Sequence, residues 1–80
     1  MIQTERPSHL EHVHGIVVAT QAKDQFAVRV PGNTKPVWFR IAPGAHISLT
    51  HIQRHIREKA PTDIYYEHQQ GGLPLAWIAD

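Results

Sequence analysis

Two arginines and a tryptophan form the most informative chemical grouping in the sequence. Arg29, Trp38 and Arg40 occupy alternate positions of two short segments joined by a turn, so they share one face of a predicted hairpin. Lys23 and Lys35 lie in the flanking turns and extend the positive zone. Single-stranded nucleic acid is bound by base stacking on aromatic rings and by cations along the backbone. The grouping predicts binding of single-stranded RNA or DNA; the alternative is a packed tryptophan between solvated arginines.

The second grouping consists of histidines, of which the chain has seven. His51 and His55 are four residues apart on a predicted helix, and Glu58 follows on the same face. Two histidines at this spacing, with a carboxylate, form a candidate metal site. His12 and His14 share one face of a predicted strand. A polar, histidine-rich surface and a pH sensor are the alternatives, and we expect neither a bound metal nor a cofactor.

Residue types suited to covalent catalysis are scarce. The chain has no cysteine, which excludes thiol chemistry and thiolate zinc sites. Its serines are Ser8, in a polar N-terminal segment, and Ser48, which is placed to cap a helix. No nucleophile-elbow, phosphate-loop or paired-carboxylate motif is present, and Gly71 and Gly72 indicate a turn. We therefore predict that the protein is not an enzyme.

Length and composition predict one small folded domain. The 80 residues are 41% hydrophobic and 19% charged, with a formal net charge of +1. Such a balanced charge does not by itself point to a polyanionic partner. Residues 1–8 lack an apolar signal segment, and the longest apolar run, at 73–79, is too short to span a membrane. We expect a cytoplasmic protein with a flexible arm at residues 1–9 and a domain at 10–80.

Hydrophobic periodicity predicts mainly β-structure with one helix. Strands are expected at residues 10–20, 26–30, 37–41, 63–68 and 75–79, and a helix at 48–60, stopped by Pro61. Gly15, inside the first strand, suggests a bulge or a sharp bend. The helix carries a narrow apolar stripe of Leu49, Ile52 and Ile56, suited to one buried face.

Strict alternation assigns faces in the second and third strands. Phe26, Val28 and Val30 are expected to face one side, with Ala27 and Arg29 on the other. In the third strand Val37, Phe39 and Ile41 are expected inside, and Trp38 and Arg40 outside. The element order β-β-β-α-β-β is that of a five-stranded OB-like barrel. The alternative is an SH3-like barrel in which the helix is an insertion.

A family resemblance covers about residues 10–41. It consists of a Gly-x-Val strand, a Phe-x-Val strand and the adjoining residues: Leu10, Glu11, Gly15, Val17, Phe26, Val28, Pro31, Gly32 and Asn33. These residues resemble the first hairpin of bacterial translation initiation factor one and its OB-fold relatives. The resemblance implies RNA binding across strands two and three, with Phe26, Arg29, Trp38 and Arg40 at the matching positions.

A protein partner is the alternative to nucleic acid on this hairpin. Small barrels offer edge strands and aromatic patches to other proteins, and tryptophan and arginine are common binding hot spots. Trp38 and Arg40 serve either partner, so the sequence leaves nucleic-acid binding and protein interaction, including self-association, both open.

Overall fold

The computed structural model describes residues 9–80 and contains the six predicted elements in the predicted order. They are β1 (Glu11–Gln21), β2 (Gln25–Arg29), β3 (Val37–Ile41), α1 (Leu49–Glu58), β4 (Pro61–Glu67) and β5 (Leu75–Ala79). Most of the predicted N-terminal arm, residues 1–8, lies outside the described part of the chain. Of the described residues, none belongs to a helix long and apolar enough to cross a membrane.

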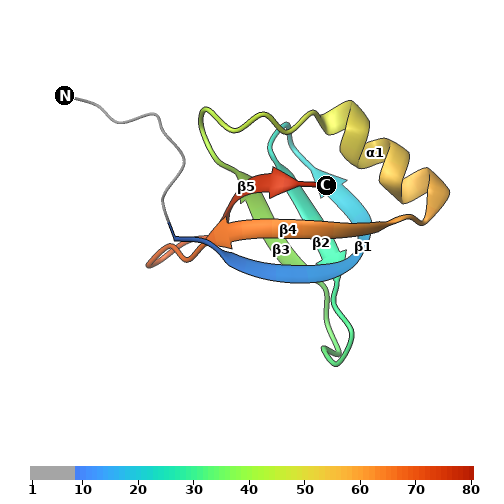
Figure 1. The fold of residues 1–80 in the computed structure, drawn as a ribbon, viewed down its shortest axis with the longest axis horizontal. Helices are drawn as coiled ribbons and strands as arrows, with labels where there is room; N and C mark the ends of the chain where they lie inside the picture. The colour runs from blue at the N-terminus through green and yellow to red at the C-terminus, as the bar shows by residue number, and fades with distance from the viewer. Residues whose placement is uncertain (1–8) are drawn as a thin grey trace.

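The five strands close into a ring in the order β1-β2-β3-β5-β4 (Figure 1). All neighbours are antiparallel except β3 and β5, which run parallel and pair only at Arg40–Leu75 and Ile41–Ala76. The long strand β1 closes the ring because its two halves pair with different strands. Its first half pairs with β4 from Glu11 to Ile16, and its second half pairs with β2 from Ile16 to Gln21. The prediction of a mainly β fold with five strands and one helix is confirmed.

Gly15 lies where β1 passes from one partner strand to the other. A Cβ atom at this position would be 2.7 Å from Val28 Cγ1 and would also overlap the backbone carbonyl oxygen of Arg29. Only glycine allows the backbone of β2 to approach β1 this closely. The irregularity in register lies further along, between Val17 and Ala19. We expected a bulge or a sharp bend at Gly15; the residue permits a close strand crossing, and the register irregularity is at Val18 instead.

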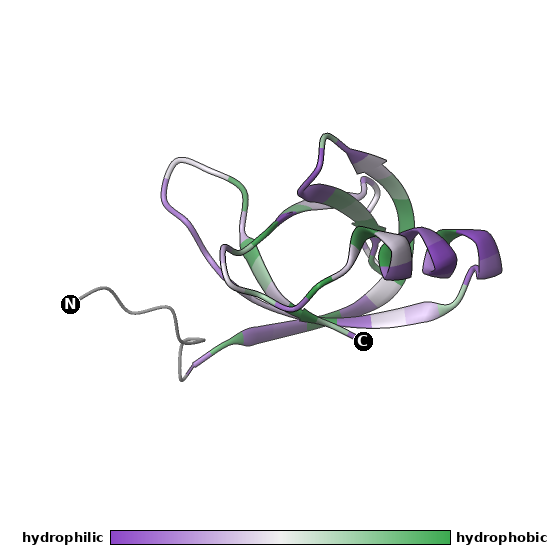
Figure 2. Cartoon of the chain, turned by 90° about the horizontal axis from the view of Figure 1, so that it is seen from above, coloured by the Kyte–Doolittle hydropathy of each residue, from purple (hydrophilic) through white to green (hydrophobic). Residues whose placement is uncertain are grey.

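The core fills the inside of the ring. Its fully buried large hydrophobic side chains come from β1, β2, β3, β4 and the helix: Val17, Phe26, Val28, Phe39, Ile52 and Ile64. Figure 2 shows these hydrophobic stretches along the strands, while most of α1 is hydrophilic. Ile52 is the buried residue of α1, and Ile56 packs against the core from its edge. The narrow apolar stripe therefore covers the ring with one face, as predicted.

The helix is shorter than the predicted 48–60. Ser48 is the N-cap, as expected, and its hydroxyl accepts a hydrogen bond from the backbone N–H of His51. Lys59 ends the helix by adopting a left-handed conformation with φ of 53°. β4 then starts at Pro61, two residues before its predicted start, because Pro61 pairs with Ile16 of β1. The proline therefore begins a strand as well as excluding further helix.

Candidate functional site

The β2–β3 register brings the predicted arginines and tryptophan onto one outer face. Trp38 lies directly opposite Ala27, and Arg40 lies opposite Gln25. Side chains at opposite positions of an antiparallel pair point to the same side, and so do residues two apart on one strand. Arg29, two residues beyond Ala27, is therefore on this face too, and both arginines are exposed. Trp38 is half-buried and lies between them.

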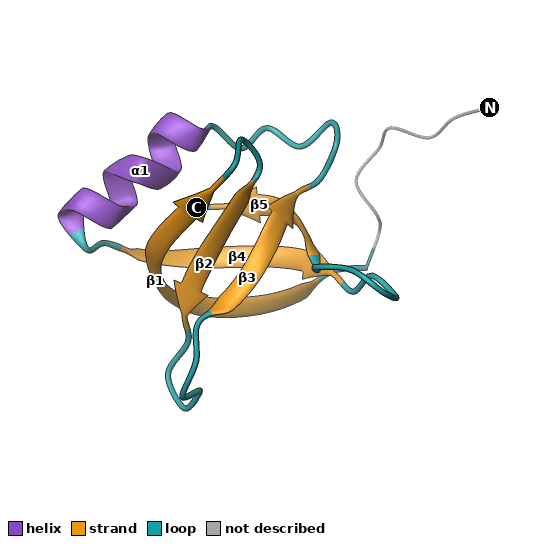
Figure 3. Cartoon of the chain, turned by 180° about the vertical axis from the view of Figure 1, so that it is seen from behind, coloured by secondary structure: helices purple, strands orange, loops and turns teal. Residues whose placement is uncertain are grey.

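The cations form a line along the hairpin. Arg40 and Arg29 are separated along the strand direction by four residue steps, or about 13 Å. Lys23 belongs to the β1–β2 turn beside the Arg40 end, and Lys35 belongs to the loop beyond the Arg29 end; both are exposed. Figure 3 shows this β2–β3 loop projecting from the ring. We name Lys23, Arg40, Trp38, Arg29 and Lys35, in this spatial order, the hairpin face.

One acidic side chain reaches the hairpin face. Asp24 Oδ2 lies 3.6 Å from Arg40 Nε, and both side chains are about half exposed. An exposed ion pair of this length is screened by water and contributes little to stability. The contact involves one nitrogen of a guanidinium group that carries five N–H donors. Arg40 therefore keeps donors for a phosphate, although Asp24 lowers the positive potential around it.

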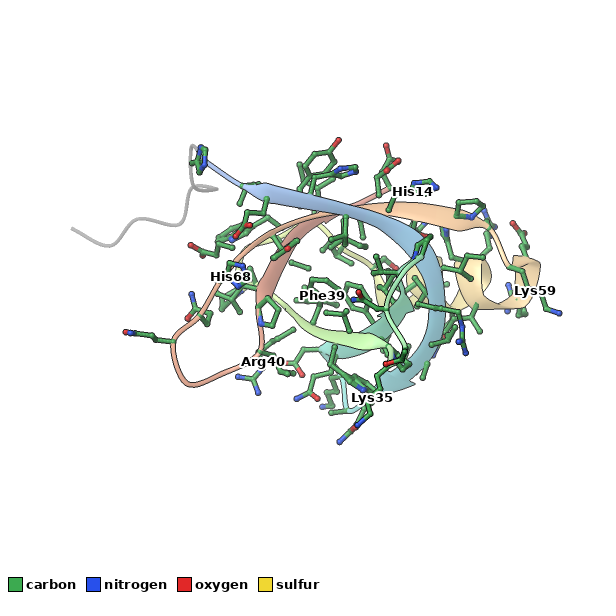
Figure 4. All side chains as sticks on the ribbon, turned by 90° about the horizontal axis from the view of Figure 1, so that it is seen from below. His14, Lys35, Phe39, Arg40, Lys59 and His68 are labelled. Atoms are coloured by element: carbon green, nitrogen blue, oxygen red, sulfur yellow. The ribbon has the colours of Figure 1, made fainter. Side chains whose placement is uncertain are left out.

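Phe26 is not part of the exposed surface. Its side chain is 0% exposed and lies opposite Phe39, with the two ring centroids 5.7 Å apart. Figure 4 shows Phe39 inside the ring, whereas Arg40 and Lys35 point away from it. The resemblance implied a binding role for Phe26, but in this structure its ring supports the hairpin from the core. The aromatic side chain on the outer face of the β2–β3 hairpin is Trp38.

Ala27 is on the predicted outer face but is not open to solvent. It is 1% exposed, and its register partners are Ala19 on β1 and Trp38 on β3. A methyl group between two flanking side chains is easily covered by the larger one. The alternation rule thus gave the correct side for Ala27, and the side alone does not decide exposure, because a larger neighbour such as Trp38 can cover a small residue.

The predicted metal-binding residues are brought together only in part. His51 Nε2 and His55 Nε2 lie 3.0 Å apart on the exposed side of α1. Glu58, the third predicted ligand, is exposed and has no contact with the pair among the interactions of residues 9–80. Within this part of the chain, no group of three or more histidine, aspartate or glutamate side chains is arranged to hold a metal ion.

A histidine–carboxylate cluster joins β1 to β4, and sequence reasoning missed it. Asp63 Oδ1 lies 2.8 Å from His12 Nε2 and 2.9 Å from His14 Nδ1. These contacts, first with His14 and then with His12, lower the pKa of Asp63 from its ordinary value of 3.8. A third pair, His68 Nε2 to Glu11 Oε2 at 2.8 Å, joins the start of β1 to the residue that follows β4. The shared face of His12 and His14 was visible in the sequence, but their partner on β4 was not.

Comparisons with known proteins give no relative from which a function can be taken. No family model, no curated protein and no solved structure matches the chain.

Proposed function

We propose that the protein is a non-enzymatic OB-type module that binds single-stranded RNA or DNA on the hairpin face. The ring order β1-β2-β3-β5-β4, with a helix between β3 and β4, supports an OB-type barrel over an SH3-like one. OB-folds bind oligonucleotides on the face of strands 2 and 3 and on adjoining loops. A cytoplasmic location remains a prediction of the sequence.

The observation that carries the proposal is the position of Trp38 between Arg40 and Arg29. A partly exposed indole offers a flat surface on which a base of any type can stack, worth about 1–3 kcal/mol per base. The flanking arginines are placed to contact phosphates on either side of that base, and Lys23 and Lys35 continue the line at both ends. A strand of nucleic acid would thus run parallel to β2 and β3, with little preference for sequence.

The test is a titration of the full chain with a fluorescently labelled oligonucleotide, followed by anisotropy at about 50 mM salt. We expect binding that weakens as the salt concentration rises, because phosphate contacts release counterions. Trp38→Ala and Arg40→Ala should each weaken binding by about tenfold, whereas Trp38→Phe should retain most of it because a phenyl ring still stacks. A label on the oligonucleotide avoids interference from Trp77, whose indole Nε1 donates to Glu67 Oε1.

Arginines on the helix supply the matched control. Arg54 and Arg57 are exposed on α1, so Arg54→Ala and Arg57→Ala remove the same charge from a different surface. These variants should bind the oligonucleotide as the wild type does. If all four alanine variants weaken binding equally, the attraction is non-specific and the hairpin face is not the site. Absence of any binding at low salt would refute the proposal.

Binding of a protein partner is the second candidate function, and the short pairing between β3 and β5 favours it. β3 pairs with β5 only at Arg40 and Ile41, so no strand covers this edge of residues 37–39 within the described chain. An extended peptide can add to such an edge through backbone hydrogen bonds, with Trp38 beside it as an anchor. Self-association is the version that can be tested without a known partner. Sedimentation at two protein concentrations should then show a dimer that Trp38→Ala abolishes; a monomer at both concentrations counts against self-association.

A further inference from the structure

A chain of hydrogen bonds connects the helix to the core of the ring. His51 Nε2 contacts His55 Nε2 at 3.0 Å, and His55 Nδ1 contacts Thr62 Oγ1 at 2.7 Å. Thr62, on β4, is 0% exposed, and its hydroxyl also lies 3.4 Å from the carbonyl oxygen of Ala60. The chain thus runs from an exposed imidazole to a buried hydroxyl group.

The Thr62 hydroxyl is placed to accept from one tautomer of His55. When His55 carries its proton on Nδ1, that N–H donates to Thr62 Oγ1, and the hydroxyl proton can be directed to the carbonyl oxygen of Ala60. The Nε2 atom of neutral His55 then carries a lone pair, which His51 Nε2–H can occupy. In this tautomer the free nitrogen of His55 is directed toward His51.

This arrangement meets two requirements of a metal ligand pair. Ligating histidines usually donate their second ring N–H to a fixed acceptor, which orients the ring, and the buried Thr62 hydroxyl, 2.7 Å from His55 Nδ1, is placed to be that acceptor. Two metal–nitrogen bonds of about 2.05 Å at a right angle separate their nitrogens by about 2.9 Å. The 3.0 Å between the two Nε2 atoms matches that separation.

We propose that His51 and His55 form a two-imidazole chelate for a divalent transition metal, with water completing the coordination. The metal takes the place of the proton shared by the two Nε2 atoms, and His51 moves its N–H to Nδ1, on the exposed side of α1. The site does not use Glu58 and is separate from the hairpin face. The bound metal links two residues that are one turn apart in the same helix, so metal binding also stabilises α1.

The donor set selects the class of metal. Two neutral imidazole nitrogens favour Cu²⁺, Ni²⁺ and Zn²⁺, whereas Mg²⁺ and Ca²⁺ prefer oxygen ligands. A right-angle pair of nitrogens occupies neighbouring positions of a square-planar or octahedral ion, which favours Cu²⁺ and Ni²⁺ over tetrahedral Zn²⁺. Because the protein supplies two ligands only, we expect Ni²⁺ binding far weaker than that of a closed structural zinc site.

The experiment is calorimetric titration of the untagged full chain with NiCl2, with a thermal melt at each metal ratio. We expect a single equivalent of Ni²⁺ to bind and the melting temperature to rise, because a ligand of the native state stabilises it. MgCl2 should give neither signal. With one equivalent of CuCl2, electron paramagnetic resonance should show hyperfine coupling to two imidazole nitrogens.

The matched control exchanges the residues at positions 50 and 51. The double variant Thr50→His with His51→Thr keeps composition and charge at two exposed positions, but it moves the histidine off the four-residue spacing. It should fold as the wild type does and bind Ni²⁺ at least tenfold more weakly, and the single variant His51→Gln should show the same loss. His14→Gln, in the β1–β4 cluster, should leave the affinity unchanged. Undiminished binding in both position-51 variants, or loss of binding in His14→Gln, would overturn the proposal.

Discussion

Trp38 lies directly across the β2–β3 hairpin from Ala27, and Ala27 is only 1% exposed although it faces outward. Of the two register partners of Ala27, Ala19 and Trp38, only the indole is large enough to cover it. We therefore expect Trp38 to have two roles on the hairpin face: it covers Ala27, and its exposed part is available to a ligand.

Truncating Trp38 should accordingly reduce stability as well as binding. We expect Trp38→Ala to lower the free energy of unfolding by about 1–2 kcal/mol, below the roughly 3–5 kcal/mol of a fully buried aromatic residue. Urea denaturation measures this difference, and Trp38→Phe should recover more than half of it. A cost within about 0.5 kcal/mol, which is usual for surface substitutions, would show that Ala27 is covered by something else.

Gly15 should tolerate no side chain. Its Cβ would meet Val28 Cγ1 and the carbonyl oxygen of Arg29, and a backbone carbonyl cannot rotate away as a side chain can. We expect Gly15→Ala to lower the free energy of unfolding by about 2–3 kcal/mol or to prevent ring closure. Gly72→Ala is the control, because a Cβ at Gly72 meets nothing within 4 Å, and it should change stability by less than about 0.5 kcal/mol. Similar melting temperatures for the two variants would contradict the close crossing of β1 and β2.

The elements of this fold were predictable from local pattern because each is specified by neighbouring residues. The alternation in residues 37–41 assigned Phe39 to the core and Arg40 to the surface, and Ser48 marked the helix start. The cluster of His12, His14 and Asp63 was not predictable, since the contacting residues are 51 and 49 positions apart. Only the register of β1 against β4 places Asp63 opposite His14, and nothing local in the sequence encodes that register.

In the candidate site, too, local pattern predicted some features and tertiary contacts decided the others. Period-two alternation and the turn at residues 31–33 were sufficient to put Arg29, Trp38 and Arg40 on one face, which the register confirms. The contact of Asp24 with Arg40 depends on how the β1–β2 turn folds beside the end of β3, so alternation could not reveal it. Likewise, the hydroxyl of Thr62 lies beside His55 because of how the chain turns from α1 into β4 after Lys59, which local pattern does not reveal.

Lys59 should be replaceable by glycine with a gain in stability. It ends α1 with φ of 53°, a conformation that costs a residue with a Cβ about 1 kcal/mol and costs glycine little. We expect Lys59→Gly to raise the free energy of unfolding by about 0.5–1 kcal/mol in urea denaturation. Arg57→Gly, two residues earlier in the helix, should lower it by about 1 kcal/mol, because glycine is a poor helix former. Destabilisation by both substitutions would show that Lys59 does not hold the left-handed cap.

The contribution of Asp63 to stability should depend on pH in a defined direction. Hydrogen bonds from His14 and His12 lower the pKa of Asp63 below 3.8, so its carboxylate is stabilised in the folded state. A lowered pKa gives stability that is fully present above the unfolded value and is lost as the pH falls through the folded value. Wild type should therefore be more stable than Asp63→Asn near neutral pH, and the difference should shrink below about pH 4. Urea denaturation across this range measures the difference; a constant gap down to pH 2 would contradict the assignment.

Asp24 should weaken nucleic-acid binding if the hairpin face is the site. Its carboxylate lies 3.6 Å from Arg40 Nε, where it competes with a phosphate for the guanidinium group and lowers the local potential. We expect Asp24→Asn to strengthen oligonucleotide binding by about two- to fivefold at low salt, which corresponds to an exposed ion pair, and by less at high salt. Glu58→Gln changes the net charge by the same amount on α1, where the residue is also exposed, and serves as the matched control. Because both substitutions remove one negative charge, equal gains would indicate attraction by net charge alone. A gain confined to Asp24→Asn would place the bound strand beside Arg40.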